Sequence, residues 1–378
     1  MDRRCLMKWA SAISEESNLE AALAGCAASI REQLGEAPQL AVAFVSPHYQ
    51  PDYGRVGPLL SEPLGAEHAF GCSGGGIIGA GVEVEQRPAV SVTAATLPGV
   101  EIEAFHLEGD KLPDLDAGPD KWTELLGVMD SQDPQFVLLA DPSVAFASGA
   151  QRPGDNALFL DGQMHGSGAI GLALHGNITV DTVVAQGCRP IGEAMRITSS
   201  HRNVLAELDG KAPMAVLQDL FRTLSERDRQ LMGHSLFLGV VMDEFLDTPV
   251  QGDFLIRNVV GMDQKTGSLA IGEMLKEGQV VQFHLRDADT SAEDLTFVLE
   301  RYAADNRENE VPGALLFSCL GRGQYLYGRP NHDTEIFQEK LGQVPLGGFF
   351  CNGEIGPVGG TTFLHGYTSS FGLFRSRS

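Results

Sequence analysis

The chain has 378 residues, enough for two domains or for one large body of two parts. Hydrophobic residues make up 43% of it, yet no stretch approaches the ~20 consecutive apolar residues that span a bilayer, so we expect a globular protein without membrane insertion. The formal charge of −23 repels phosphate backbones and anionic membrane surfaces, which argues against nucleic-acid binding.

The amino end carries basic residues but neither the apolar block nor the small-residue cleavage site of a secretory leader. Six cysteines are scattered along the chain, with no Cys-x-x-Cys pair and no zinc-finger spacing. The ten histidines are equally dispersed and form no pair at metal-ligand spacing. We therefore expect reduced thiols, no metal site and a cytoplasmic location.

Apolar residues at three- and four-residue steps predict a helix over residues 15–36, and a buried strand follows at 40–45. Beyond a Gly-rich turn at 71–76, two-residue alternation predicts a meander of antiparallel strands. Two hairpins are predicted further along the chain. One turns at residues 175–177 and the other at 201–203, where the residues tolerate a left-handed backbone.

The last third of the chain predicts a helix over residues 291–304 and an apolar strand over 314–318. The charged segment 225–233 is the best candidate for a domain boundary. It divides the chain into a first domain at 38–235 and a second at 236–370. The expected fold is mixed α/β (α+β), with two related parts whose largely antiparallel sheets pack as a layered sandwich with helices outside.

An internal repeat is predicted, because the same order of elements occurs near both ends of the chain. Each copy has an amphipathic helix, an apolar strand, a long loop and a Gly-rich segment around a cysteine, with an offset of about 275 residues. The two cysteines are Cys72 and Cys351. The alternative is two unrelated helix–strand units, which α/β proteins often contain. If the repeat holds, these two Gly/Cys segments occupy equivalent corners of the fold.

Several segments of the chain resemble the FIST family, which is named for F-box and intracellular signal transduction contexts. They are residues 70–76, 168–174, 252–258, 317–322 and 347–357. The resemblance covers nearly the whole chain, and its C-terminal motifs are the more specific. It implies the sensing of a small ligand, with amino acids proposed as ligands, rather than an established catalytic activity. Because the chain has no room for an attached kinase, cyclase, receptor or F-box domain, its output is expected to be a protein signalling partner.

The first Gly-rich segment formally matches two enzyme motifs. One is the Gly-x-Ser-x-Gly elbow of α/β-hydrolases around Ser73, and the other is a dinucleotide-binding fingerprint at 74–79. Both motifs require a helix directly after the glycines, whereas the alternation over 77–85 predicts strands. Two interpretations of this glycine-rich segment remain. Its backbone amides face a bound anion, or it is a tight turn packed against a neighbouring element.

The ligand-binding residues are predicted around both Gly-rich segments. Arg322 can clamp a carboxylate through two parallel hydrogen bonds, and Asn352 and Glu354 can accept hydrogen bonds from an amino group. Cys319 and Cys351 can face one another or the pocket, although a buried inert cysteine is the commoner state. The full predicted set is Cys72, Ser73, Gly74, Cys319, Arg322, Cys351, Asn352 and Glu354.

The leading functional hypothesis is an intracellular sensor that binds a small, amino-acid-like ligand and relays its presence to a partner protein. No catalytic residue is assigned, and the question of an enzymatic activity stays open. One alternative is a haem-dependent nitric-oxide sensor, because a single axial histidine leaves no sequence pattern. A weaker alternative is a serine or thiol hydrolase that uses Ser73 or Cys72.

Overall fold

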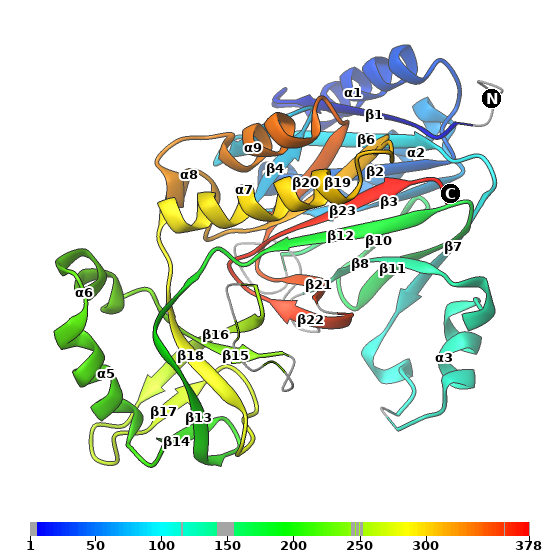
Figure 1. Ribbon diagram of the computed structural model, residues 1–378. Coiled ribbons are helices and arrows are strands. Elements are labelled where there is room, and N and C mark those ends of the chain that lie inside the picture. The colour runs from blue at the N-terminus through cyan, green and yellow to red at the C-terminus, as the bar shows by residue number, and fades with distance from the viewer. Residues whose placement is uncertain are drawn as a thin grey trace. The chain divides into compact units, whose positions relative to one another are not determined.

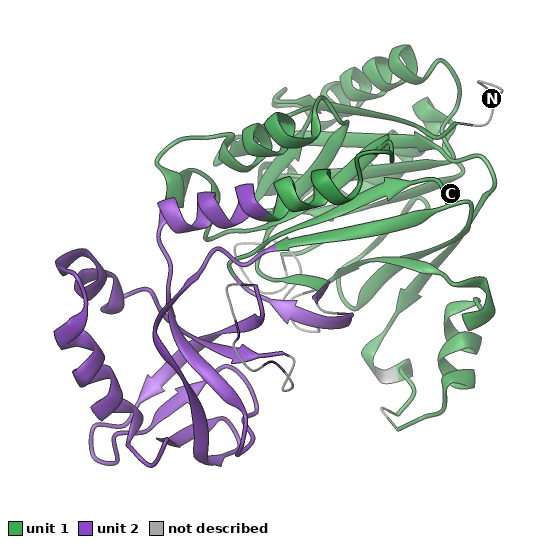
Figure 2. Ribbon diagram, in the orientation of Figure 1, with its two compact units in different colours: residues 1–184, 298–356, 367–378 green, residues 185–297, 357–366 purple. Residues whose placement is uncertain are grey.

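The computed structural model describes residues 6–114, 116–141, 155–242, 246, 249, 252–358 and 360–377 (Figure 1). It is 28% helix and 41% strand, with mixed and antiparallel sheets, so the predicted α/β class is confirmed. The chain divides into two compact units, shown in different colours in Figure 2. Unit 1 comprises residues 1–184, 298–356 and 367–378, and unit 2 comprises residues 185–297 and 357–366.

The first sheet of unit 1 has six strands in the order β1-β6-β2-β3-β9-β10. Their bounds are β1 Lys8–Ser14, β2 Leu40–Val45, β3 His68–Ser73, β6 Val90–Thr96, β9 Leu158–Leu160 and β10 Gln163–His165. Strands β2 and β3 run parallel, and β1 and β2 each pair antiparallel with β6. Parallel neighbours need a crossover, which η2 (Pro47–Arg55) and α2 (Val56–Leu64) supply.

Helix α1 (Leu19–Leu34) confirms the helix predicted near the amino end, with shorter bounds. It begins after Asn18, whose side chain accepts a hydrogen bond from Ala21 N, and it ends at Gly35 in the left-handed conformation with φ 72°. Its apolar stripe packs, together with α2, on one face of the first sheet.

The second sheet of unit 1 has the order β12-β23-β19-β20-β4-β5. Its strands are β4 Gly76–Gly79, β5 Val82–Glu85, β12 Thr179–Ala185, β19 Gly313–Cys319, β20 Leu346–Cys351 and β23 Ser369–Arg375. The parallel pair β19 and β20 is connected through α8 (Gly323–Tyr327) and α9 (His332–Leu341), and α7 (Ala288–Asp305) precedes it. Strands from both ends of the chain therefore build one sheet.

A shared apolar core joins these two sheets. Phe44 of β2 lies with its ring centroid 4.8 Å from that of Phe349 on β20 and 6.3 Å from that of Phe317 on β19. Cys72 and Cys351 belong to the same buried cluster. Sheet packs on sheet with helices outside, which is the predicted layered sandwich.

A third sheet of unit 1 has the order β7-β11-β8. Its bounds are β7 Val100–Leu107, β8 Gln135–Ala140 and β11 Ala169–Gly176, with η3 Gly109–Lys111, α3 Pro119–Leu126 and η4 Asp130–Gln132 between β7 and β8. The predicted hairpin across residues 175–177 is wrong, because β11 pairs with β7 and β8 while β12 pairs with β23. Strand β11 is the central strand of its sheet, and nearly all of its residues are buried. The residues of a local turn do not indicate which strands pair with a central strand.

Unit 2 contains a closed barrel with the order β13-β14-β17-β16-β15-β18. Its strands are β13 Arg189–His201, β14 Val204–Leu208, β15 Leu236–Val241, β16 Phe254–Met262, β17 Leu269–Ile271 and β18 Val280–Leu285. Helices α5 (Pro213–Thr223) and α6 (Glu226–Met232) belong to the same unit, and the hairpin predicted across residues 201–203 is confirmed by the pairing of β13 with β14. A two-stranded sheet pairs β21 (Glu354–Val358) with β22 (Thr361–His365).

The two parallel ladders differ at the cysteines. Phe44 lies opposite Cys72, and its counterpart in the predicted repeat, Phe317, lies opposite Phe349. Cys351 instead lies opposite Cys319, two ladder positions further on. The two cysteines therefore differ in ladder register by two positions, although both lie near the carboxyl end of the second strand of a parallel pair, and their equivalence stays a prediction. The duplication itself and the boundary between residues 235 and 236 stay predictions.

Candidate functional site

The first Gly/Cys segment is a strand end inside the core. Cys72 is fully buried on β3, and burial raises the pKa of its thiol well above the ordinary value. Ser73 is 1% exposed, and its Oγ accepts a hydrogen bond from Ala157 N at 3.0 Å. Strand β4 follows directly, so the helix that a hydrolase elbow requires is absent from this described segment. Gly74 lies against Phe349, and a Cβ added at Gly74 would be 2.7 Å from the Cβ of Phe349.

The second Gly/Cys segment lies at the carboxyl ends of the parallel strands β19 and β20. Cys319 and Cys351 are opposite each other in the ladder, and both are buried. Cys351 Sγ donates to Ser318 O at 3.4 Å and to Glu354 Oε1 at 3.3 Å. Burial and the nearby Glu354 raise the pKa of the Cys351 thiol well above its ordinary value. Both thiols are therefore buried in the protein, and the raised pKa of Cys351 disfavours its thiolate form.

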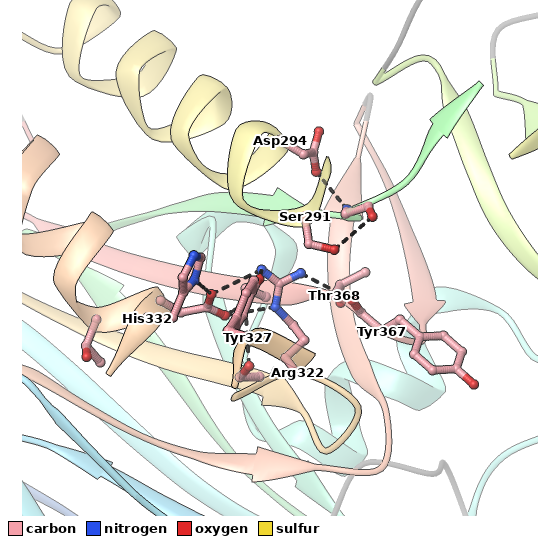
Figure 3. A network of polar contacts seen from close by, with 12 residues as sticks. Ser291, Asp294, Arg322, Tyr327, His332, Tyr367 and Thr368 are labelled. Atoms are coloured by element: carbon pink, nitrogen blue, oxygen red, sulfur yellow. Dashed lines mark hydrogen bonds and ion pairs between the residues drawn. The ribbon is translucent and has the colours of Figure 1, made fainter. Parts of the chain in front are cut away.

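Arg322 follows β19 and is fully buried. Its Nε donates to Asp333 Oδ2 at 2.8 Å and its Nη2 to Asp333 Oδ1 at 3.2 Å, while Nη2 also donates to Tyr327 Oη at 2.6 Å. Nη1 donates to Tyr367 O at 3.4 Å (Figure 3). The two parallel hydrogen bonds predicted for a ligand carboxylate are thus made to Asp333, which corrects the expected role of Arg322.

Asp333 lies in the first turn of α9 and is 1% exposed. It also accepts a hydrogen bond from Ser369 Oγ, and His332 Nδ1 lies 3.0 Å from its Oδ1. Burial alone would raise the pKa of Asp333. The charge of Arg322 and these hydrogen bonds outweigh burial and hold the pKa well below the ordinary value. Asp333 is therefore the ionised partner of Arg322.

Tyr327 and His332 stack beside this ion pair. Their ring centroids are 3.4 Å apart with an interplanar angle of 10°, and the guanidinium carbon of Arg322 lies 5.7 Å from the Tyr327 ring centroid (Figure 3). The Tyr327 ring, which is itself stacked on His332, and the Asp333 carboxylate thus hold the guanidinium in a single orientation.

Glu354 opens β21, three residues after Cys351, and is 1% exposed. Its Oε2 accepts from Thr368 N at 3.2 Å and from Thr368 Oγ1 at 2.7 Å. Burial raises the pKa of Glu354 to about 7, although these hydrogen bonds and Arg322 act in the opposite direction. This carboxyl group therefore changes charge near neutral pH.

Glu83 on β5 is a further buried carboxyl group and was not predicted from the sequence. Its Oε1 accepts from Thr334 N at 2.9 Å, and its Oε2 has no hydrogen-bond partner among the described residues. Burial and the charge of Asp333 raise its pKa to about 8. The guanidinium of Arg322 is already neutralised by Asp333, so further negative charge here is uncompensated and protonation is favoured.

The structure gathers part of the predicted set and separates the rest. Cys319, Arg322, Cys351 and Glu354 surround the carboxyl ends of β19 and β20, while Asn352 is exposed beside them. Cys72, Ser73 and Gly74 lie at the end of β3 in the neighbouring sheet. The residues that sequence reasoning missed are Glu83, Tyr327, His332, Asp333, Thr368 and Ser369. No spacing signal links them, because they come from five separate elements or loops.

Two features are absent from the part of the chain that the structure describes. No group of three or more His, Cys, Asp or Glu side chains in that part of the chain is arranged to hold a metal ion. No helix among the same residues is long and apolar enough to cross a membrane.

Two family models together match most of the chain. The FIST N domain matches residues 39–211, and the FIST C domain matches residues 213–357. Together they extend over strands of both main sheets of unit 1 and over the barrel strands of unit 2. The change from one model to the other therefore falls at the start of α5, after the first barrel hairpin.

Several curated proteins are similar to this chain. The uncharacterized protein Rv0628c of Mycobacterium tuberculosis (strain ATCC 25618 / H37Rv) is 36% identical over 96% of this chain and 98% of its own. The uncharacterized protein Mb0898c of Mycobacterium bovis is 36% identical over 92% of this chain and 94% of its own. The F-box/LRR-repeat protein At5g63520 of Arabidopsis thaliana is 27% identical over 46% of this chain and 36% of its own.

Proposed function

The chain belongs to the FIST family, and from this premise we propose that it senses an amino-acid-like small ligand and relays its binding to a partner protein. Signal transduction and small-ligand sensing are associated with FIST domains. The ligand class, the binding residues and the relay to a protein are the parts that we propose.

The observation that carries the proposal is the buried Glu354 carboxyl group at the end of the β19/β20 pair. A carboxyl group that is 1% exposed and titrates near neutral pH is costly for the fold, and such groups concentrate at functional sites. The carboxyl ends of parallel strands are also where open α/β sheets commonly bind ligands. We assign Glu354 to the ammonium group of the ligand and the exposed Asn352 to its carboxylate.

Arg322 and Asp333 have a supporting role in this proposal. Their two hydrogen bonds hold the segment after β19 against α9, so the Cys351–Glu354 corner beside it keeps one geometry. Cys72, Ser73 and Gly74 contribute to the packing behind this corner, because Gly74 lies against Phe349 of β20. A preorganised corner loses less freedom on binding, which favours affinity for a small ligand.

The proposal is tested by thermal unfolding of the purified full chain with each of the common amino acids and small organic acids. A ligand at about 100 times its dissociation constant stabilises the folded state by roughly 2.7 kcal/mol, which raises Tm by several degrees. We expect Asn352→Ala and Glu354→Gln to abolish this shift. The matched control Asn309→Ala, at an exposed residue between α7 and β19, should retain it.

Two results would contradict the proposal. If no amino acid or organic acid changes Tm, the chain does not sense this ligand class. A Soret band after incubation with haem, lost on replacement of one histidine, would instead support the haem-sensor alternative.

A further inference from the structure

The outer face of the sheet β7-β11-β8 presents apolar side chains to solvent. The inner face carries Val137, Leu139 and Leu172, which belong to the core of unit 1. By strand alternation, the outer face carries Phe136 and Leu138, which are 43% and 36% exposed. Aromatic and aliphatic side chains at alternate positions of one strand are a common docking surface for an extended segment.

Within the described part of the chain, strand β8 lies at one edge of this sheet. Among the described residues its only strand partner is β11, so β8 lies at the end of the sheet order. An exposed edge strand with apolar side chains is a template for pairing with another chain. Proteins normally protect such an edge with charge or cover it with a partner.

The segment around this sheet is strongly acidic. Residues 101–133 contain ten acidic side chains and two basic ones, Lys111 and Lys121. Both lysines are held in ion pairs, with Glu108 and Glu124 respectively. Helix α3, within this segment, has no buried residue, so its charged side chains stay in solvent. This charge repels a second copy of the same surface and attracts a cationic segment.

We propose that β8 and the outer face of its sheet bind an extended basic segment of a partner protein, in which Lys or Arg alternates with apolar residues. The apolar side chains of that segment pack beside Phe136 and Leu138. Its backbone pairs with the open edge of β8, and its cationic side chains are attracted by the field of the acidic segment 101–133, whose β7 part lies beyond β11. The role of this segment as the partner in the relay rests on the proposed function. Its binding to β8 does not, because that binding can be measured without any small ligand.

The test uses the full chain and a labelled peptide of roughly ten residues that alternates Lys and Val, long enough to pair with the six residues of β8. Fluorescence anisotropy at about 0.15 M salt measures the affinity. A peptide of Lys and Ser has the same charge without apolar side chains. Hydrogen exchange with and without the Lys–Val peptide reports whether β8 amides become protected.

Two double variants probe the apolar and charged parts of the surface. Phe136→Ser with Leu138→Thr, and Glu103→Lys with Asp130→Lys, should each weaken peptide binding about tenfold. The control pair Glu308→Lys with Glu310→Lys makes the same change in charge at exposed residues of another segment and should change the affinity less than about twofold. All four target side chains of the probing variants are exposed, so folding should be retained.

Three outcomes would overturn the inference. Equal weakening by the control pair, or equal affinity for the Lys–Ser peptide, would mean that net charge alone attracts cations. Unchanged exchange of β8 amides would mean that no strand is added. A dimer that is lost on Phe136→Ser would mean that this face binds a second copy. Each of these results leaves the thermal-shift test of ligand sensing unaffected, so the two proposals can fail separately.

Discussion

The ion pair between Arg322 and Asp333 is the interaction whose loss should be most costly. Asp333→Asn keeps the size of the side chain but removes its charge, and the guanidinium is then left uncompensated at 0% exposure. Both hydrogen bonds, at 2.8 and 3.2 Å, lose their charged acceptor. Breaking one side of a buried pair costs about 3–5 kcal/mol, so we expect a loss of that size in the free energy of unfolding.

Denaturant unfolding at neutral pH measures this loss. The matched control is Glu20→Gln, which breaks an ion pair with Arg55 whose side chains are 61% and 51% exposed. That change should cost less than about 1 kcal/mol because solvent screens the pair. The double variant Arg322→Met/Asp333→Leu should lose less stability than Asp333→Asn, since it removes the unpaired charge as well.

The stability conferred by this ion pair depends on pH. The folded-state pKa of Asp333 is lowered from 3.8, so its stabilising contribution is present above that value and is lost as pH falls towards the folded pKa. The difference in stability between wild type and Asp333→Asn should therefore shrink below about pH 4. A loss from Asp333→Asn no larger than that from Glu20→Gln would refute the buried ion pair as a major stabilising interaction.

Two further predictions concern the same unit. The folded-state pKa of Glu83 is raised from 4.5 to about 8, so between these values wild-type stability should fall as pH rises, by up to ~1.4 kcal/mol per pH unit from this group. Glu83→Gln should flatten that slope in denaturant titrations from about pH 5 to pH 8, and an unchanged slope would contradict the assignment. Gly71→Ala should cost about 1–3 kcal/mol because its Cβ would lie 1.9 Å from Ala43 O, measured by the same unfolding assay. Gly25 lies in α1, and a Cβ added there has no atom within 4 Å, so Gly25→Ala should stabilise the fold by about 1 kcal/mol. If both substitutions change the free energy of unfolding in the same direction, the steric argument is refuted.

Local patterns predicted the elements that depend on local physics. The apolar periodicity and the cap residues Asn18 and Gly35 place α1, and the continuous apolar runs identify β2 and β19 as buried strands. The glycine after Cys319 was correctly placed beyond the end of a buried strand, whereas the segment predicted as a turn at 71–76 contains the end of β3 and the start of β4. The absence of a predicted helix after Ser73 also correctly argued against the hydrolase elbow.

The sequence by itself therefore determined the class of fold and the family. Only the tertiary structure decided that β11 and β12 belong to different sheets, that Asp333 occupies the fork of Arg322, and that Glu83 is buried beside them. The physical reason is that side-chain periodicity reports which face of an element is buried, but not what buries it. Strand partners, ion pairs and the pKa of a buried carboxyl group depend on residues that are distant in sequence, and these come together only when the sheets pack.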